Sequence, residues 1–217
     1  MPPYSLLPLR SSEPSTQNYL DAKMRSYEVC LENECYDDAY VNAHLIFMYW
    51  LYCKLWAVVM AEQRLADRIF ALHSFDSRFD RTKFLVTQSA LELHNLKLEE
   101  RKYAEVFGAL CLDREDVKKL KQLVDDRNKI LHPSGTILFD SHEELEQPLE
   151  VQKELANKIA PATAEMYLSL IQGAYGPLSY RKVLKWEADY DLEQELFTKY
   201  HLSEVDLSAI KRTLRKK

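Results

Sequence analysis

Glycine is scarce in this chain: only four occur among its 217 residues, at positions 108, 135, 173 and 176. Average usage is about 7%, so the sequence has few of the tight turns that glycine normally serves. It also has no internal repeat, heptad array, glycine-rich phosphate loop or Ser-His-Asp order, which argues against repeat proteins, coiled coils, P-loop enzymes and serine hydrolases. Long helices joined by few turns remain, and we predict an all-α fold, an up-and-down helical bundle.

Cysteines are few and show no pattern of metal ligands. Cys30, Cys35, Cys53 and Cys111 form no Cys-x-x-Cys pair and have no zinc-type spacing to histidine. The N-terminus has neither the basic region nor the apolar run of a signal peptide. We therefore expect reduced thiols in a cytoplasmic protein, with no metal and no cofactor.

Positive charge is not in excess. The formal net charge is −5 and the sequence pI is about 5.7, so overall charge gives no argument for nucleic-acid binding. Lysine and arginine nevertheless concentrate in residues 118–129 and again in residues 211–217. Either group could contact phosphates, although solvated helix faces and a favourable interaction with a helix C-terminus explain such charges as well.

The chain divides into three parts by composition. Four prolines and several serines mark residues 1–17 as an extended or loosely docked arm. Residues 18–176 carry the long periodic segments of the bundle, and residues 177–217 form a C-terminal helical extension. We predict helices over residues 18–33, 38–72, 80–99, 101–110, 113–131 and 148–172, followed by two or three shorter ones.

Several details refine these boundaries. Pro148 suits the first turn of its helix, and Pro161 should kink or break that helix. Ser203 and Asp206 have the spacing of a capping pair at the start of the last helix. Residues 136–140 could be extended.

The most hydrophobic stretch, residues 39–60, is long enough to span a bilayer. Asn42, His44 and Lys54 interrupt it, aromatic residues crowd it, and no second span lies nearby. We therefore predict a helix buried at the centre of a bundle or at a dimer interface, and no membrane partner. A histidine in such a helix is usually a hydrogen-bonded core residue; the alternative for His44 is that it faces the functional site.

Residues 125–135 carry the two side chains that most resemble a functional pair, Arg127 and His132. They lie near the end of a helix that we predict to begin with the capping pair Asp113 and Asp116. Pro133 biases the preceding histidine away from the α region, so this helix should stop at or just before His132. An arginine presents a planar set of donors suited to phosphate oxygens, and a histidine can exchange protons near neutral pH.

The spacing of this pair has a simpler explanation as well. A helix C-terminus favours cationic side chains, so Arg127 and His132 could merely complement the helix dipole. On an ideal helix the two positions point roughly 140° apart, because each residue turns by about 100°. One helical face therefore cannot present both; a helix that unwinds at His132 or a second subunit would bring them together.

The segment from Arg127 through Asn128 to His132 resembles the motif of HEPN domains, a family of all-helical ribonucleases, toxins and nucleotide-binding modules. In that motif an arginine, commonly followed by a polar residue, is separated from a histidine by four to six intervening residues, and this chain has four. The resemblance covers residues 20–175 in architecture and about ten residues in specific motif. It implies a homodimer in which both Arg–His pairs meet in one cleft.

The resemblance also implies an activity: metal-independent cleavage of RNA, by a toxin or an antiviral-defence effector that an antitoxin encoded nearby can restrain. Arg127, Asn128 and His132 would be catalytic, and Lys121 and Lys129 would contact the substrate.

Two other functions fit the sequence. The protein could be a non-catalytic HEPN-like dimer that binds RNA, nucleotide or a protein, or a helical interaction protein in which the motif only caps a helix. Asp125 and Asp126 leave a further alternative open, because they could orient the motif side chains, repel phosphate, or pair with neighbouring lysines.

Overall fold

A computed structural model describes residues 3–8, 14–62, 67, 99–132, 137–188 and 198–216. These residues are helical and include no strand, which confirms the all-α prediction; the one bridge among them is an isolated antiparallel pairing of Pro8 with Ser203. In chain order the elements are η1 (Pro3–Leu6), α1 (Pro14–Glu32), α2 (Tyr36–Ala61), α6 (Glu100–Leu110), α7 (Arg114–Leu131), α8 (His142–Tyr175), α9 (Tyr180–Ala188) and α11 (Glu204–Lys216).

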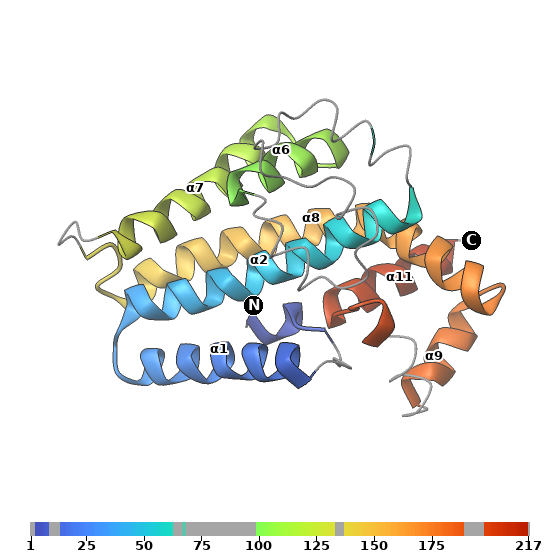
Figure 1. Ribbon diagram of the computed structural model, residues 1–217, viewed down its shortest axis with the longest axis horizontal. Coiled ribbons are helices and arrows are strands. Elements are labelled where there is room, and N and C mark those ends of the chain that lie inside the picture. Colours follow the sequence, from blue (N-terminus) through green and yellow to red (C-terminus); the bar gives the residue numbers. More distant parts are fainter. Residues whose placement is uncertain are drawn as a thin grey trace.

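Helix α2 forms the centre of the bundle and contacts α1, α7 and α8 (Figure 1). Because apolar side chains surround this helix, 18 of its 26 residues are buried, including His44 and Lys54. By length and composition α2 could also cross a membrane, but 89% of its most apolar window is buried inside the structure, as in a core helix. The predicted central helix is therefore present, and it ends at Ala61 rather than at Leu72.

Helices α6 and α7 pack closely against each other. A Cβ atom added to Gly108 of α6 would lie 2.7 Å from Val117 Cγ2 of α7, so only glycine permits this approach. Asp113 caps α7: its side chain accepts the N–H groups of Glu115 and Asp116, and the Asp116 side chain accepts the Asp113 N–H in return. The predicted start and end of this helix are both confirmed.

Helix α8 differs from the prediction. It begins at His142, with Ser141 as its N-cap, and not at Pro148; it then continues through Pro161 without a break. Each proline leaves the carbonyl four residues earlier without its helical donor. Those carbonyls belong to Glu144 and Asn157, which are exposed, so water can satisfy them and the helix persists.

The other boundaries shift by a few residues. Helix α1 starts at Pro14 instead of residue 18, with the proline in the first turn, where it lacks no helical partner. The helix predicted over 80–99 and most of the segment 63–72 lie outside the described residues. Residues 137–140 have no regular structure, and the Asp37 carboxylate accepts the N–H groups of Leu138 and Phe139 at 2.8–3.2 Å.

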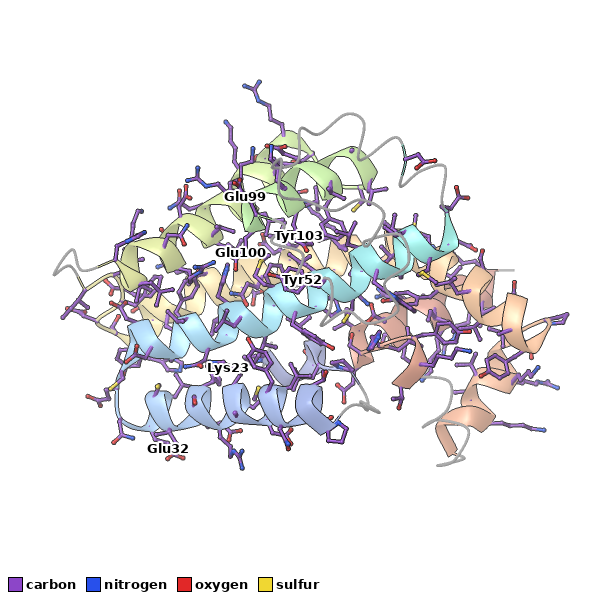
Figure 2. All side chains as sticks on the ribbon, viewed as in Figure 1. Lys23, Glu32, Tyr52, Glu99, Glu100 and Tyr103 are labelled. Carbon is purple, nitrogen blue, oxygen red and sulfur yellow. The ribbon has the colours of Figure 1, made fainter. Side chains whose placement is uncertain are left out.

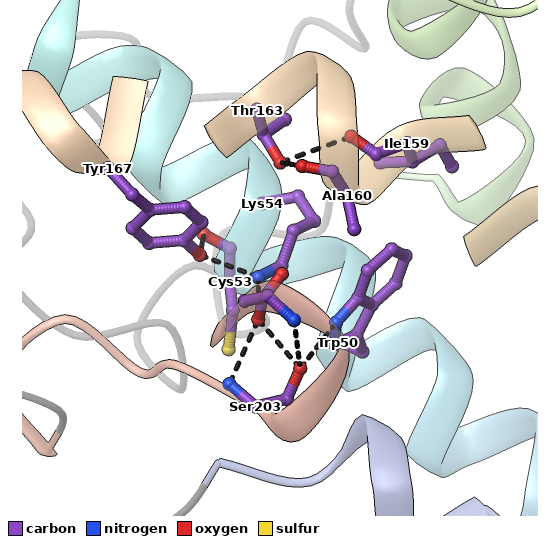
Figure 3. Close-up of polar contacts among 9 residues, drawn as sticks. Trp50, Cys53, Lys54, Ile159, Ala160, Thr163, Tyr167 and Ser203 are labelled. Carbon is purple, nitrogen blue, oxygen red and sulfur yellow. Dashed lines mark hydrogen bonds and ion pairs between the residues drawn. The ribbon is translucent and has the colours of Figure 1, made fainter. Parts of the chain in front are cut away.

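The C-terminal helix α11 is joined to the core by a buried ion pair between Lys54 of α2 and Asp206 (Figure 3). Lys54 also donates to the Tyr167 hydroxyl of α8 at 2.7 Å, and Ser203 donates to Asp206 at 2.7 Å. Trp50 donates from Nε1 to the Ser203 hydroxyl at 3.1 Å. The predicted Ser203–Asp206 capping pair is confirmed, and it belongs to a network that links α2, α8 and α11.

Candidate functional site

Helix α7 brings the predicted motif to a defined helix end. His132 is its C-cap, with extended backbone angles (φ −86°, ψ 136°), and its N–H donates to the Asn128 carbonyl at 3.0 Å. This is the effect predicted for a residue that precedes proline. The imidazole is exposed and forms no hydrogen bond or ion pair with the described residues.

Arg127 points in a different direction, into the bundle. Its guanidinium forms a close ion pair with Glu100, the first residue of α6. The Arg127 and Glu100 side chains keep only 19% and 14% of their exposure. The chain therefore does not bring Arg127 and His132 together: the arginine is bound between helices, and the histidine lies on the surface.

His44 completes this cluster from α2. Its Nε2 lies 3.3 Å from the same Glu100 oxygen, Oε2, that Arg127 contacts. Of the two alternatives for His44, the first is confirmed: the ring is fully buried and hydrogen-bonded to Glu100, and it shares this partner with the motif arginine. Figure 2 shows Glu100 near Tyr103 and Tyr52, whose rings pack with centroids 4.8 Å apart.

Burial and charge act in opposite directions on this cluster. Burial raises the pKa of the Glu100 carboxyl, but contacts with His44 and Arg127 outweigh it and hold that pKa well below its usual range. Burial is also the main influence on His44 and lowers the pKa of its imidazole, although Glu100 opposes this. At neutral pH we therefore expect an anionic Glu100 between a cationic Arg127 and a neutral His44.

Two polar atoms in the cluster are buried without a hydrogen-bond partner among the described residues: His44 Nδ1 and Arg127 Nε. A neutral imidazole that donates from Nε2 to Glu100 has an acceptor at Nδ1, whereas Arg127 Nε is a donor. Buried atoms without a partner also occur elsewhere among the described residues, including Asp206 Oδ1 beside Lys54, so they do not by themselves mark a ligand site.

The remaining motif residues are placed along α7. Asn128 is half-buried; Lys129 pairs with Asp126 at 3.1 Å, and Lys121 pairs with Glu105 at 3.3 Å. Asp125 is occupied elsewhere, by Arg101. The two predicted substrate-contact lysines are thus on the surface of the motif helix, and neither shares the partner of Arg127.

Glu100 was missed by sequence reasoning. It lies 27 positions before Arg127, and in the sequence it is one of several acidic residues around the start of a short helix. Acidic residues are common in the first turn because they complement the helix dipole, so nothing local indicates a second role. A search for charged residues on helices expected to face the motif helix could have proposed it as one of several candidates.

A separate groove of about 400 Å³ lies between α7, α8 and residues 137–140. Its volume is in the range of small-molecule sites, yet it contains none of the predicted catalytic or substrate-contact residues. Its lining is mixed in charge and polarity and consists of Lys118, Lys119, Gln122, Leu123, Asp126, Phe139, Glu144, Gln147, Pro148 and Val151.

Among the described residues, no group of three or more His, Cys, Asp or Glu side chains is arranged to hold a metal ion. Comparisons with protein-family models, with curated proteins and with solved structures gave no significant match. The candidate site is therefore defined by its own geometry: an arginine fixed between three helices, and an exposed histidine at the end of the same helix.

Proposed function

We propose that the protein is a metal-independent endoribonuclease of the HEPN type, active as a homodimer. The proposal rests on the arrangement of two side chains at the end of α7. There Arg127 is restrained but partly accessible, and His132 is exposed at the residue where the helix stops. An arginine can stabilise charge on a phosphoryl group, and a histidine can transfer a proton near neutral pH.

In the proposed reaction the ribose 2′-oxygen forms a bond to phosphorus, and the bond from phosphorus to the 5′-oxygen breaks. His132 accepts the proton of the 2′-hydroxyl, and a second acid gives a proton to the leaving 5′-oxygen. In a dimer, His132 of the partner subunit can be that acid. The products are a 2′,3′-cyclic phosphate and a 5′-hydroxyl, and Arg127 stabilises the negative charge that builds up on the phosphoryl oxygens.

A second subunit would resolve the separation of the two motif side chains. Arg127 of one chain faces Glu100 while its own His132 points to solvent, so a copy that packs near the end of α7 could supply the missing histidine. The residues on either side of His132 suit such a contact, because Leu131 and Ile137 are 57% and 71% exposed.

The biological role that accompanies this activity in the resembling family is that of a toxin or antiviral-defence effector in the cytoplasm. RNA is then the substrate, and an antitoxin encoded nearby is a candidate partner. Lys121 and Lys129 are surface cations on the motif helix and could contact the RNA backbone beyond the scissile phosphate.

The test is an RNase assay in EDTA on total tRNA and mRNA, with analysis of the product ends. We expect cyclic phosphate ends from the wild type and activity lower by about 10²–10³-fold in Arg127→Ala, from the loss of one charge-stabilising group. His132→Ala should lose about 10²–10⁴-fold, the usual contribution of a general acid or base. Both variants should keep wild-type helicity.

Matched controls are available on the same surface. Arg101→Ala removes another arginine that pairs with a carboxylate between α6 and α7, and His142→Ala removes another exposed histidine at a helix end. Both should cleave like the wild type. Full activity in Arg127→Ala and His132→Ala would refute the assignment of the site.

The charges in the site and on the whole chain favour the non-catalytic alternative. Glu100 neutralises Arg127 within the chain, and the net charge of −5 does not attract RNA. If the wild type cleaves none of the RNA pools but binds RNA or nucleotide, and Arg127→Ala weakens that binding, the same site is a binding module.

A further inference from the structure

We infer that Glu100 and His44 are positioning residues of this site: one carboxylate, shared by the imidazole of α2 and the guanidinium of α7, fixes Arg127 as a preformed anion-binding group. The inference rests on the proposed function, because it assigns Arg127 the role of phosphate contact. It adds two residues, from two other helices, that lie outside the Arg–His motif.

Side chains from three helices converge on this cluster. Glu100 opens α6, Arg127 lies in the last turns of α7, and His44 lies within the buried part of α2. Their contacts join residues 27 and 56 positions apart in the sequence. Because three separate helices hold these groups, the guanidinium cannot move far without a change in helix packing.

The arginine has more donors than its contact with Glu100 uses. A guanidinium has five N–H donors in one plane, and the contact with Glu100 is made through one terminal nitrogen. Arg127 Nε is itself buried, but the side chain as a whole keeps 19% of its exposure. Glu100 therefore orients the guanidinium and leaves the N–H groups of the other terminal nitrogen for a phosphate.

His44 restrains the Glu100 carboxylate. Its ring contacts the carboxylate oxygen that Arg127 also contacts, so it limits rotation of the Glu100 side chain. Burial keeps the imidazole neutral by lowering its pKa, so His44 does not repel the arginine. A histidine that holds a carboxylate, which in turn holds an arginine, is the kind of support that keeps a site in one geometry.

A neighbouring ion pair provides a matched control. Arg101 and Asp125 join the same two helices, α6 and α7, again through an arginine and a carboxylate. Their side chains are 58% and 31% exposed, and the pair does not include a motif residue. Asp125→Asn therefore breaks an α6–α7 contact without freeing Arg127, whereas Glu100→Gln frees it.

The experiment has a spectroscopic arm that does not depend on activity. We would record the arginine Nε–H signals of the full-length protein by NMR while adding a 2′-O-methyl RNA oligonucleotide, which cannot be cleaved. In the wild type and in Asp125→Asn, we expect a protected Arg127 signal that shifts on titration. In Glu100→Gln that signal should exchange with solvent and lose its defined position, and an unchanged Arg127 signal there would overturn the inference.

The kinetic arm applies if the wild type cleaves RNA. Misplacing a catalytic group by about 1 Å can cost about 10²-fold in rate, so Glu100→Gln should lower kcat by about 10–100-fold and change KM little. Glu100→Asp, which keeps the charge, should recover part of the loss. If Glu100→Gln and Asp125→Asn had equal kinetics, the Glu100 contact would only join the helices and would not position Arg127.

His44 is tested in the same way with two variants. Glutamine can place a side-chain N–H near the position of the histidine Nε2, whereas methionine fills the space without a donor. We expect His44→Gln to retain the Arg127 signal and most of kcat, and His44→Met to resemble Glu100→Gln. Equal behaviour of these two variants would show that His44 does not position the site.

A wild type that cleaves no RNA refutes the proposed nuclease, and the oligonucleotide titration then decides whether Glu100 positions Arg127.

Discussion

Helix α2 contributes to two ion-pair clusters that differ in access. Ten residues after His44, Lys54 pairs with Asp206, and both of those side chains are fully buried. In the His44 cluster, Arg127 and Glu100 keep 19% and 14% exposure. Each cluster also has a buried atom without a partner among the described residues, Asp206 Oδ1 in one and Arg127 Nε in the other. An unpaired atom therefore does not by itself separate a structural cluster from a candidate site.

The two clusters differ in the groups that surround the cation. Lys54 donates to the Tyr167 hydroxyl and lies 4.4 and 5.1 Å from the ring centroids of Tyr167 and Trp50, so aromatic side chains and a carboxylate enclose it (Figure 3). Arg127 pairs with one carboxylate, that of Glu100, and its side chain keeps 19% of its exposure. A buried charge therefore marks a candidate site when a ligand can still reach it, and a structural link between helices when a ligand cannot.

The largest expected effect follows from breaking the closed cluster. Lys54→Met leaves Asp206 charged and buried without its cation, and removing one partner of a buried ion pair typically costs about 3–5 kcal/mol. We expect a loss of this size in the free energy of unfolding, measured by urea denaturation. The double variant Lys54→Met/Asp206→Asn should lose less, because asparagine is uncharged and can still accept the hydrogen bond of the Ser203 cap.

An exposed pair provides the control. Lys119 and Glu154 join α7 and α8 on the surface, so Lys119→Met should change stability little. If Lys54→Met is tolerated equally well, α11 is not held by a buried charge, and the distinction between the two clusters disappears.

Acid should destabilise the two regions in different pH windows. In the Lys54 region, burial and then the charge of Lys54 lower the pKa of His201 from 6.5 to about 4. The unfolded chain therefore takes up that proton first, and stability falls as the pH drops from about 6.5 to about 4. In the Arg127 region, Glu100 has a pKa of about 2 instead of 4.5, so its contribution is complete above about 4.5 and is lost toward about 2.

Two variants separate these windows in urea denaturation at a series of pH values. His201→Asn should reduce the upper slope; asparagine tolerates the left-handed φ of 51° at this position. Some upper slope should remain, because burial also lowers the pKa of His44. Glu100→Gln should reduce the lower slope alone. Some lower slope should remain, because the pKa values of Glu105 and Asp113 are lowered as well; a lower slope equal to that of the wild type would show that Glu100 does not contribute to it.

The sequence predicted the motif helix well because its signals are local. Asp113 and Asp116 cap its start, and Pro133 sets its end at His132. A local signal also existed for α8 and was overlooked: Ser141 accepts the Glu144 N–H, and Glu144 accepts the Asp140 N–H, a variant of the capping box that precedes Pro148 by several residues. Pro148 favours a helix that starts at the proline, but in α8 the Ser141 cap sets the start and the proline lies in the second turn.

The environment of Arg127 could not be predicted in this way. The sequence identified the residue, but its partner depends on how α6 packs against α7, and His44 joins because α2 packs against α7. Such contacts carry no spacing rule, since they connect residues far apart along the chain. The sequence also left open whether one chain unites Arg127 with His132; the structure answers for the single chain, where they are apart.

The smallest expected effect tests the packing that places Glu100 beside Arg127. Gly173→Ala, in open space on α8, should raise the free energy of unfolding by up to about 1 kcal/mol, because alanine favours helix more than glycine. The same change at Gly108 puts a methyl group 2.7 Å from Val117 Cγ2, so the gain should vanish or reverse. Adding Val117→Ala to Gly108→Ala should relieve this clash, and urea denaturation of all variants measures each step. If Gly108→Ala were as stabilising as Gly173→Ala, α6 and α7 would lie farther apart, and Glu100 could not hold Arg127 as tightly as the positioning role requires.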